Sequence, residues 1–323
     1  MAINLPDNFV KQYSSNLQIL TQLMGNRFAG KCREESIEGE EKYFDQLGNV
    51  VAANRTTRSG GGQFPDSPES SVTHYRRQVT ATPYDTGLFV DRIEKAQTMI
   101  DPESPYARQQ VVALNRKRDQ EFLTAALGDA KTGKTGSGTA AFTDCPVVDV
   151  GTGGTGNQGM NLEKLIEALS ALEVSGVDVL DPENKPYFVW TPKQKNELLK
   201  NTQVTSSDYA AVKALVSGQI NSFYGFEFIT STLVPYVNTA GTGVSADWST
   251  TTDAPVDTDS TDIRGCFAYT KNNILMATNP EITTRAEERA DKSFDWYAYA
   301  VARFGGVRME EKKTVFVPCD ESP

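Results

Sequence analysis

Residues 102–138 read PESPYARQQVVALNRKRDQEFLTAALGDAKTGKTGSG and support two incompatible interpretations. The last part, from Gly128 to Thr135, matches the phosphate-loop pattern G-x-x-x-x-G-K-[ST] at every position. The part before it, residues 104–127, has the composition of one long charged helix. A phosphate loop connects a buried strand to a helix, so that backbone N–H groups and the helix N-terminus face the phosphates. The first interpretation predicts a nucleotide hydrolase, whereas the second predicts a protein organised around a long helix.

The helix is supported at both ends. Ser104 suits the capping position, and Pro105 suits the first helical position, where its missing N–H is not needed. Gly128 suits the position after the last turn, where the backbone adopts a left-handed conformation. Apolar or small residues recur at Ala107, Val111, Leu114, Phe122 and Ala125. These signals predict a single helix over 104–127, which at about 1.5 Å per residue is roughly 36 Å long.

The phosphate-loop match lacks the elements that should surround it. No apolar strand precedes Gly128, and the residues that follow Thr135 read GSG, which is a poor start for a helix. A second motif, G-x-G-x-x-G at 151–156, follows a short apolar stretch, but the next helix begins only near Asn161. We therefore interpret both motifs as glycine-rich connections. A nucleotide-binding protein that uses residues 128–135 is the alternative from the enzyme class.

Composition limits the classes of partner. The chain has 323 residues, of which 38% are apolar and 23% charged, enough for two domains or for one body with elaborations. No run approaches the ~20 apolar residues of a membrane span, and we expect neither a membrane segment nor a signal peptide. The net charge is −10, and the first 150 residues carry 17 Lys and Arg against 19 Asp and Glu. Since tight DNA binders have basic surfaces, we expect at most loose, non-specific proximity to DNA.

Few residues are suited to catalysis or metal binding. His74 is the only histidine, and it lies in a Gly-, Pro- and Ser-rich segment, so we expect an exposed loop residue. A single histidine excludes a two-histidine zinc site. The cysteines are far apart in sequence, form no C-x-x-C pair and are predicted to be free thiols: Cys32, Cys145, Cys266 and Cys319. We therefore expect no enzyme, no cofactor and no metal.

A basic, glycine-rich segment is the main candidate for an interaction. Residues 55–68 read RTTRSGGGQFPDSP, which predicts a mobile excursion or a hairpin tip, with strands nearby at 41–47, 72–82 and 88–93. A basic segment on an acidic chain indicates contact with an acidic surface, for which a neighbouring copy is the favoured partner; a solvated linker is the other interpretation. The candidate contact residues are Arg55, Arg58, Phe64, Arg76 and Arg77.

Outside these segments, the pattern alternates between helix and strand. Apolar periodicity predicts helices at 8–24, at 162–172, at 193–200 and after Asp208. Strands are predicted at 186–190, 226–229, 266–270, 274–277, 282–285, 307–309 and 314–317, and a Thr- and Asp-rich surface loop at 237–262. Residues 294–304 are dense in aromatics and fit either a strand with large residues on both faces or a short buried helix.

The order of these elements resembles that of a tailed-bacteriophage major capsid protein of the Johnson fold, the Hong Kong 97 type. The resemblance extends over nearly the whole chain, and it rests on the order of the elements and on their residue patterns. Its most telling parts are the long helix and the phrase FYGFEFITS at 223–231; VWTPKQ at 189–194 and the β-rich end, from 277 to 319, add to it.

The resemblance implies an α+β capsid subunit with an extended loop and two domains. Its parts are an N-terminal arm (1–30), an extended loop across a neighbouring subunit (31–85), a peripheral domain (86–159) with the spine helix 104–127, an axial α/β domain (160–262) and a β-rich return (263–323).

The resemblance also implies a function without an active site. The chain is expected to assemble, as hexamers and pentamers, into an icosahedral shell that encloses viral double-stranded DNA. It would be made in the host cytoplasm and reside in the virion, with decoration, scaffold or portal proteins as further partners and no membrane. Another structural part of a virion, such as a tail or decoration protein, is the second alternative. Some relatives cross-link subunits through Lys and Asn, but no position here stands out for that chemistry.

Overall fold

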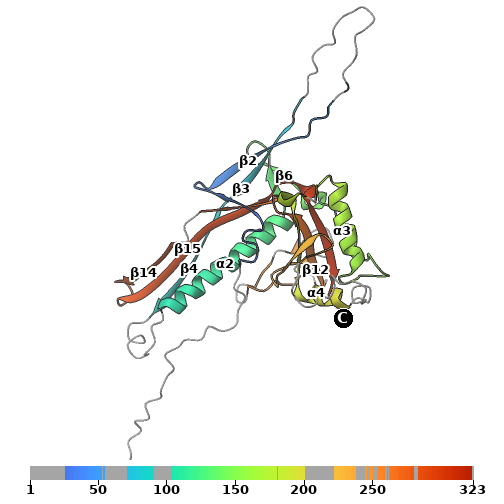
Figure 1. Cartoon of the computed structure of the whole chain (residues 1–323). Helices are drawn as coiled ribbons and strands as arrows, with labels where there is room; N and C mark the ends of the chain where they lie inside the picture. The colour runs from blue at the N-terminus through green and yellow to red at the C-terminus, as the bar shows by residue number, and fades with distance from the viewer. Residues whose placement is uncertain are drawn as a thin grey trace, which may run out of the picture.

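The structure is a computed structural model that describes residues 26–52, 54, 71–90, 103–179, 181–200, 222–237, 244–245, 247–249, 253–258, 260, 262–279 and 283–321. A long helix, α2, runs along an elongated sheet and ends against a second sheet (Figure 1). A narrow two-stranded arm projects from the place where these parts meet (Figure 1).

Helix α2 spans Glu103–Leu127, so the helix predicted over 104–127 is confirmed. It ends directly before Gly128, as the sequence indicated, but Gly128 does not adopt the left-handed conformation expected there. Its N–H donates to the carbonyl of Thr124 at 2.8 Å, and a Cβ at this position would lie only 2.6 Å from that carbonyl oxygen. No proline or glycine interrupts the helix after its first turn, which allows its length.

The elongated sheet is built on one 14-residue strand, β15 (Asp295–Arg308). One edge of β15 pairs with β4 (Thr82–Val90), and the other pairs with β14 (Thr283–Arg289) and then β13 (Ile274–Thr278). Strand β1 (Arg33–Ser36) extends the sheet by pairing in parallel with β13. The structure thus decides the alternatives left open for residues 294–304 in favour of a strand, which also includes residues 307–308.

Helix α2 covers one face of this sheet. Its Leu114 packs with alternate residues of β15, namely Ala300, Ala302 and Phe304. Near the end of the helix, a Cβ at Gly306 would lie only 2.7 Å from the Cβ of Ala125, so the missing side chain lets α2 and β15 approach closely.

The second sheet has the strand order β11-β10-β12-β7-β9-β8, and β16 pairs with β12. Two helices, α3 (Leu162–Val174) and α4 (Pro192–Lys200), accompany it. The strands are β7 (Pro186–Trp190), β8 (Ser222–Phe223), β9 (Phe226–Thr230), β10 (Tyr236–Val237), β11 (Val244–Ser245), β12 (Ile263–Thr270) and β16 (Thr314–Asp320).

Strand β12 is buried on both faces. Cys266 and Ala268 belong to the core that includes Leu165 of α3, whereas Phe267 and Tyr269 belong to the core formed with the end of α2. The last turns of α2 therefore join the elongated sheet to the α/β body by apolar packing, which is the dominant stabilising contribution in folding.

The third sheet, ordered β2-β3-β5-β6, connects the arm to the body. The arm strands β2 (Glu41–Leu47) and β3 (His74–Thr80) pair antiparallel, and the small hairpin of β5 (Ala130–Thr132) and β6 (Gly138–Ala140) joins the other edge of β3. Short 3-10 turns complete the structure at Phe142–Asp144, Pro182–Asn184 and Glu311–Lys313.

Most predicted elements are confirmed, with small shifts at their ends. The strand predicted at 72–82 spans His74–Thr80, and β4 starts at Thr82; between them the N–H of Ala81 donates to the carbonyl of Glu40 at 3.0 Å. The segment 237–262 was predicted as loop only, but it begins with the end of β10 and contains β11. The predicted helices at 8–24 and after Asp208, and the tip at 55–68, lie outside the described residues.

Candidate assembly surface

The phosphate-loop match is a β-hairpin. Residues 130–140 form β5, a tight turn and β6, and no helix follows Thr135. Gly133 and Gly136 both have positive φ, at 93° and 68°, which the turn requires. The N–H of Gly133 already donates to the carbonyl of Arg76 at 3.2 Å. This geometry does not provide the row of free N–H groups at a helix start that a nucleotide phosphate needs.

The glycine motif at 151–156 forms an exposed turn. The helix after it, α3, is capped by its own chain, because the Asn161 side chain accepts from the N–H of Lys164 at 2.9 Å. The same side chain donates to the carbonyl of Thr152 at 2.7 Å, which holds the turn against the helix start. A dinucleotide pyrophosphate would need that helix N-terminus to be open.

Nothing in the described part of the chain resembles a metal centre or a membrane span. No group of three His, Cys, Asp or Glu side chains there could hold a metal ion. None of the helices in those residues is long and apolar enough to cross a bilayer. All four cysteines are free and buried, as predicted, and burial raises the pKa of Cys32 to about 12 and of Cys145 to about 11. His74 is exposed, but it starts strand β3 and does not lie in a loop.

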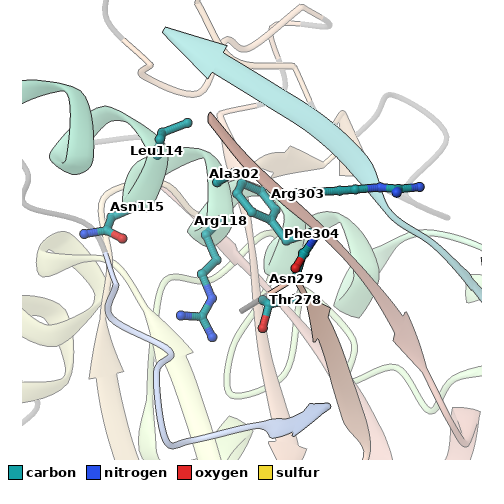
Figure 2. A pocket seen from close by; sticks show the side chains of 8 residues that line it. All are labelled: Leu114, Asn115, Arg118, Thr278, Asn279, Ala302, Arg303 and Phe304. Carbon is teal, nitrogen blue, oxygen red and sulfur yellow. The ribbon is translucent and has the colours of Figure 1, made fainter. Parts of the chain in front are cut away.

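A small cavity lies between α2 and the elongated sheet. Its lining comes from α2, β13 and β15, and Figure 2 shows Arg303 pointing away from the helix. Arg118 is already engaged, because it forms an ion pair of 2.8 Å with Glu34 on β1. The cavity volume of about 140 Å³ is well below the roughly 300–1,000 Å³ of sites for drug-sized ligands.

The arm presents apolar side chains that the described residues of its own chain leave uncovered. Leu47 is 70% exposed and Val51 is 85% exposed, and Val50 and Val72 are also exposed. These four residues, here called the arm apolar set, flank the basic glycine-rich tip on both sides. Contiguous exposed apolar side chains on a projecting element are typical of surfaces that another chain covers.

The predicted contact residues fall into three groups. Arg55, Arg58 and Phe64 lie outside the described residues. Arg76 lies on the outer part of β3, where its guanidinium forms an ion pair of 2.6 Å with Asp45 of β2. Arg77 instead points inward: it is 7% exposed and donates within the chain.

A buried charged cluster anchors the arm to the body. Arg77 donates through Nε to the carbonyl of Met309 at 2.9 Å, and its Nη2 lies 2.8 and 2.9 Å from the two carboxylate oxygens of Glu311. Arg308 is fully buried, and it donates to the carbonyls of Ala126 and Gly128 at 2.9 and 2.7 Å. It therefore satisfies carbonyls at the end of α2 that have no partner within the helix. The cluster ties β3, β15 and α2 together at one point.

A second anchor fixes the start of the described chain to α2. Asp119 is 1% exposed, and its two carboxylate oxygens accept the backbone N–H of Arg27 at 3.1 and 3.0 Å. Burial raises the pKa of this carboxyl to about 6, although the hydrogen bonds from Arg27 and Phe28 act in the opposite direction.

The pairings in both anchors could not be predicted from the sequence, and Arg77 was expected to contact a neighbouring copy instead of Glu311. Arg77 and Glu311 are 234 positions apart, and Asp119 lies 92 positions from Arg27, so no local pattern links them. The arm apolar set carried a usable signal, since Val50, Val51 and Val72 flank a glycine- and proline-rich segment without the alternation of a half-buried strand.

Solved structures of phage capsids have the same fold as this chain. The capsid structure of Helicobacter pylori bacteriophage KHP30 covers 100% of this chain and 99% of its own, with a TM-score of 0.69 and 11% identity. That of cyanophage P-SCSP1u covers 98% and 94%, with a TM-score of 0.67 and 16% identity. A structure from Mycobacterium phage Che8 covers 96% and 97%, with a TM-score of 0.64 and 16% identity. At these identities the likeness shows the fold.

A search among curated proteins gave no sequence match. The model of a protein family described as phage capsid protein, in contrast, matches residues 5–321, which is nearly the full length. This match assigns the chain: it belongs to the phage capsid protein family.

Proposed function

We propose that this protein builds an icosahedral shell around double-stranded viral DNA by laying its arm on a neighbouring copy. Membership of the family gives the general role: the chain is a major capsid protein that self-assembles into the shell and is part of the virion. The proposal adds how the copies are joined and what the shell contains.

The observation that carries the proposal is the exposed arm apolar set. Full burial of a Val or Leu side chain contributes about 1.5–3 kcal/mol. Because these four side chains are between 37% and 85% exposed in the single chain, covering them would contribute roughly 1 kcal/mol each, or about 4 kcal/mol per contact. A weak contact of this size, repeated at every subunit, suits a shell, since each copy contributes an arm and receives one.

In this proposal each part has a role. The elongated sheet with α2 is the peripheral domain, and the sheet with α3 and α4 is the axial domain around the centre of a hexamer or pentamer. Arg76, together with Arg55, Arg58 and Phe64 of the tip, contacts the neighbour. Arg77 sets the direction of the arm from inside the subunit, which its contacts with Met309 and Glu311 support.

The net charge of the chain bears on how the inner surface of the shell meets the packaged DNA. A net charge of −10 supports loose proximity to packaged DNA, because tight phosphate neutralisation needs an excess of Lys and Arg. We propose a structural, non-enzymatic role, synthesis in the host cytoplasm, and contacts with portal, scaffold or decoration proteins at the shell. The hairpin at 130–140 argues against nucleotide hydrolysis.

Electron microscopy of the purified protein tests this proposal. We expect closed shells of uniform size from the natural chain, and loss of shells when residues 55–70 are removed or when Val51→Asp is introduced. Val174→Asp is the matched control, because Val174 is also 85% exposed but lies at the end of α3. Tubes would indicate a tail protein, and shells that persist in both arm variants would contradict the role given to the arm.

A further inference from the structure

A cationic pocket lies at the outer part of β2 and β3, on the side of the β5–β6 hairpin. Its volume is about 440 Å³, and it is lined by side chains of β2, β3 and the hairpin turn. Three of these can carry positive charge, namely His74, Arg76 and Lys134, whereas Asp45 is the one carboxylate in the lining. Lys134 is the lysine of the phosphate-loop match, and the hairpin that carries it does not form a nucleotide-binding site.

The pocket has a wall that is fixed by hydrogen bonds. Thr132 donates through its hydroxyl to the carbonyl of Arg76 at 2.9 Å, and the N–H of Gly133 donates to the same carbonyl at 3.2 Å. A side chain at Gly136 would overlap the amide of Gln78, so the turn also lies directly against β3. The position of the Lys134 backbone relative to the arm is therefore set by the fold.

The charges in the pocket are unequal. Arg76 and Asp45 neutralise one another through their ion pair of 2.6 Å. Lys134 is exposed and has no carboxylate within ion-pair distance among the described residues. Lys134 is thus the one Lys or Arg of the lining without an acidic partner, in a concave site on a protein whose net charge is −10.

The border of the pocket is apolar on one side. Leu47 lies directly opposite His74 in the β2–β3 register, so both project on the same face, and Leu47 is 70% exposed. Tyr43 lies under the guanidinium of Arg76, at 5.7 Å from its centre to the ring. An apolar and aromatic border beside a few charges is typical of protein–protein contacts.

We propose that this pocket is the docking site for a carboxylate-bearing segment of a second copy of this chain, and that Lys134 receives the carboxylate. The proposal rests on the shell function proposed above. The donor segment belongs to residues 151–323, since these carry 15 Lys and Arg against 23 Asp and Glu and hold most of the acidic excess. DNA is the weaker candidate, because phosphate binding uses several Lys and Arg side chains along a surface, whereas Lys134 is the one Lys or Arg of this lining that is not paired with a carboxylate.

Charge reversal tests the proposal, with a matched control in the same hairpin. Lys134→Glu should raise the protein concentration at which half of the chain is found in shells by at least about tenfold, because close charge pairs at interfaces couple strongly. Lys131→Glu should leave that concentration within twofold, since Lys131 is equally exposed on β5 but lies outside the pocket. Circular dichroism and thermal unfolding establish that each variant is folded.

Cross-linking of the natural protein gives an independent readout. Shells are assembled from a mixture of ¹⁴N- and ¹⁵N-labelled chains and treated with a zero-length carbodiimide, and the peptides are identified by mass spectrometry. We expect Lys134 to be linked to an Asp or Glu of residues 151–323 in mixed-label peptides. Links only within one chain, links of Lys134 to DNA when DNA is present during assembly, or normal assembly of Lys134→Glu would overturn the proposal. If the natural chain forms no shells at all, it is the proposed function that fails.

Discussion

Replacement of Arg308 by methionine should strongly destabilise the subunit. Its guanidinium is fully buried and donates to the carbonyls of Ala126 and Gly128, at 2.9 and 2.7 Å, and lies 5.6 Å from the ring of Phe142. Methionine has a similar length and fills much of the space, but it donates no hydrogen bond. The two carbonyls would then be buried without a partner, at about 1–3 kcal/mol each.

The loss of the contact between Arg308 and Glu311 adds little to the free energy lost in the Arg308→Met variant. Glu311 lies 3.9 Å from Arg308 but keeps its ion pair with Arg77, so it is not left as an unpaired buried charge. We therefore expect the free energy of unfolding to fall by about 3–4 kcal/mol, within the range observed when one member of a buried charged cluster is removed.

Urea unfolding under conditions that prevent assembly measures this change. Lys313→Met is the matched control, because Lys313 forms a surface ion pair with Glu310, and such pairs contribute at most about 1 kcal/mol. Hydrogen exchange of the last turn of α2 should accelerate in the Arg308 variant alone. A loss of less than 1 kcal/mol in Arg308→Met would refute the reasoning that this side chain holds the end of α2.

Three further predictions concern the core and its titratable groups. Folding raises the pKa of Asp119 to about 6, so the folded state holds this proton more tightly than the unfolded chain does. Relative to Asp119→Asn, the free energy of unfolding should therefore fall by about 1–2 kcal/mol between pH 5 and pH 7.5. A rise over this pH range would contradict the assignment. Gly306→Ala should destabilise by about 1–3 kcal/mol in urea unfolding, because its Cβ would crowd α2, whereas Gly39→Ala meets only ordinary contacts and should be nearly neutral. The cysteines should react with a thiol reagent at pH 8 only after unfolding, since all are buried; rapid reaction of one in the folded chain would show that its site opens.

The long helix could be predicted because its signals are local. Pro105 and Gly128 lie within two residues of its ends, Glu103 and Leu127, although the helix begins one residue before Ser104, which was expected to cap it. The same locality explains why the phosphate-loop match was a coincidence, because a glycine that ends a helix and the glycines of a tight hairpin happen to have the required spacing.

Strand β15 could not be assigned from its pattern alone. Ala300, Ala302 and Phe304 face α2, whereas Tyr297 and Tyr299 project from the opposite face and are only half-exposed. Large side chains on both faces hide the period of two that identifies a half-buried strand. The partner strands, β4 and β14, supply the missing information, and one of them lies more than 200 residues away in sequence.

The contact residues of the arm show a similar limit. Arg76 and Arg77 are neighbours of the same type, yet the first reaches the surface and the second is buried against Glu311. Successive side chains of a strand point to opposite faces, and only the register with β2 and the position of the body decide which face is buried.

The central claim is that a neighbouring copy covers the arm, and a reconstruction of the assembled shell by cryo-electron microscopy tests it most directly. Leu47 and Val51, 70% and 85% exposed in the single chain, should both become buried against a second copy. A shell in which both side chains remain exposed to solvent would contradict the account.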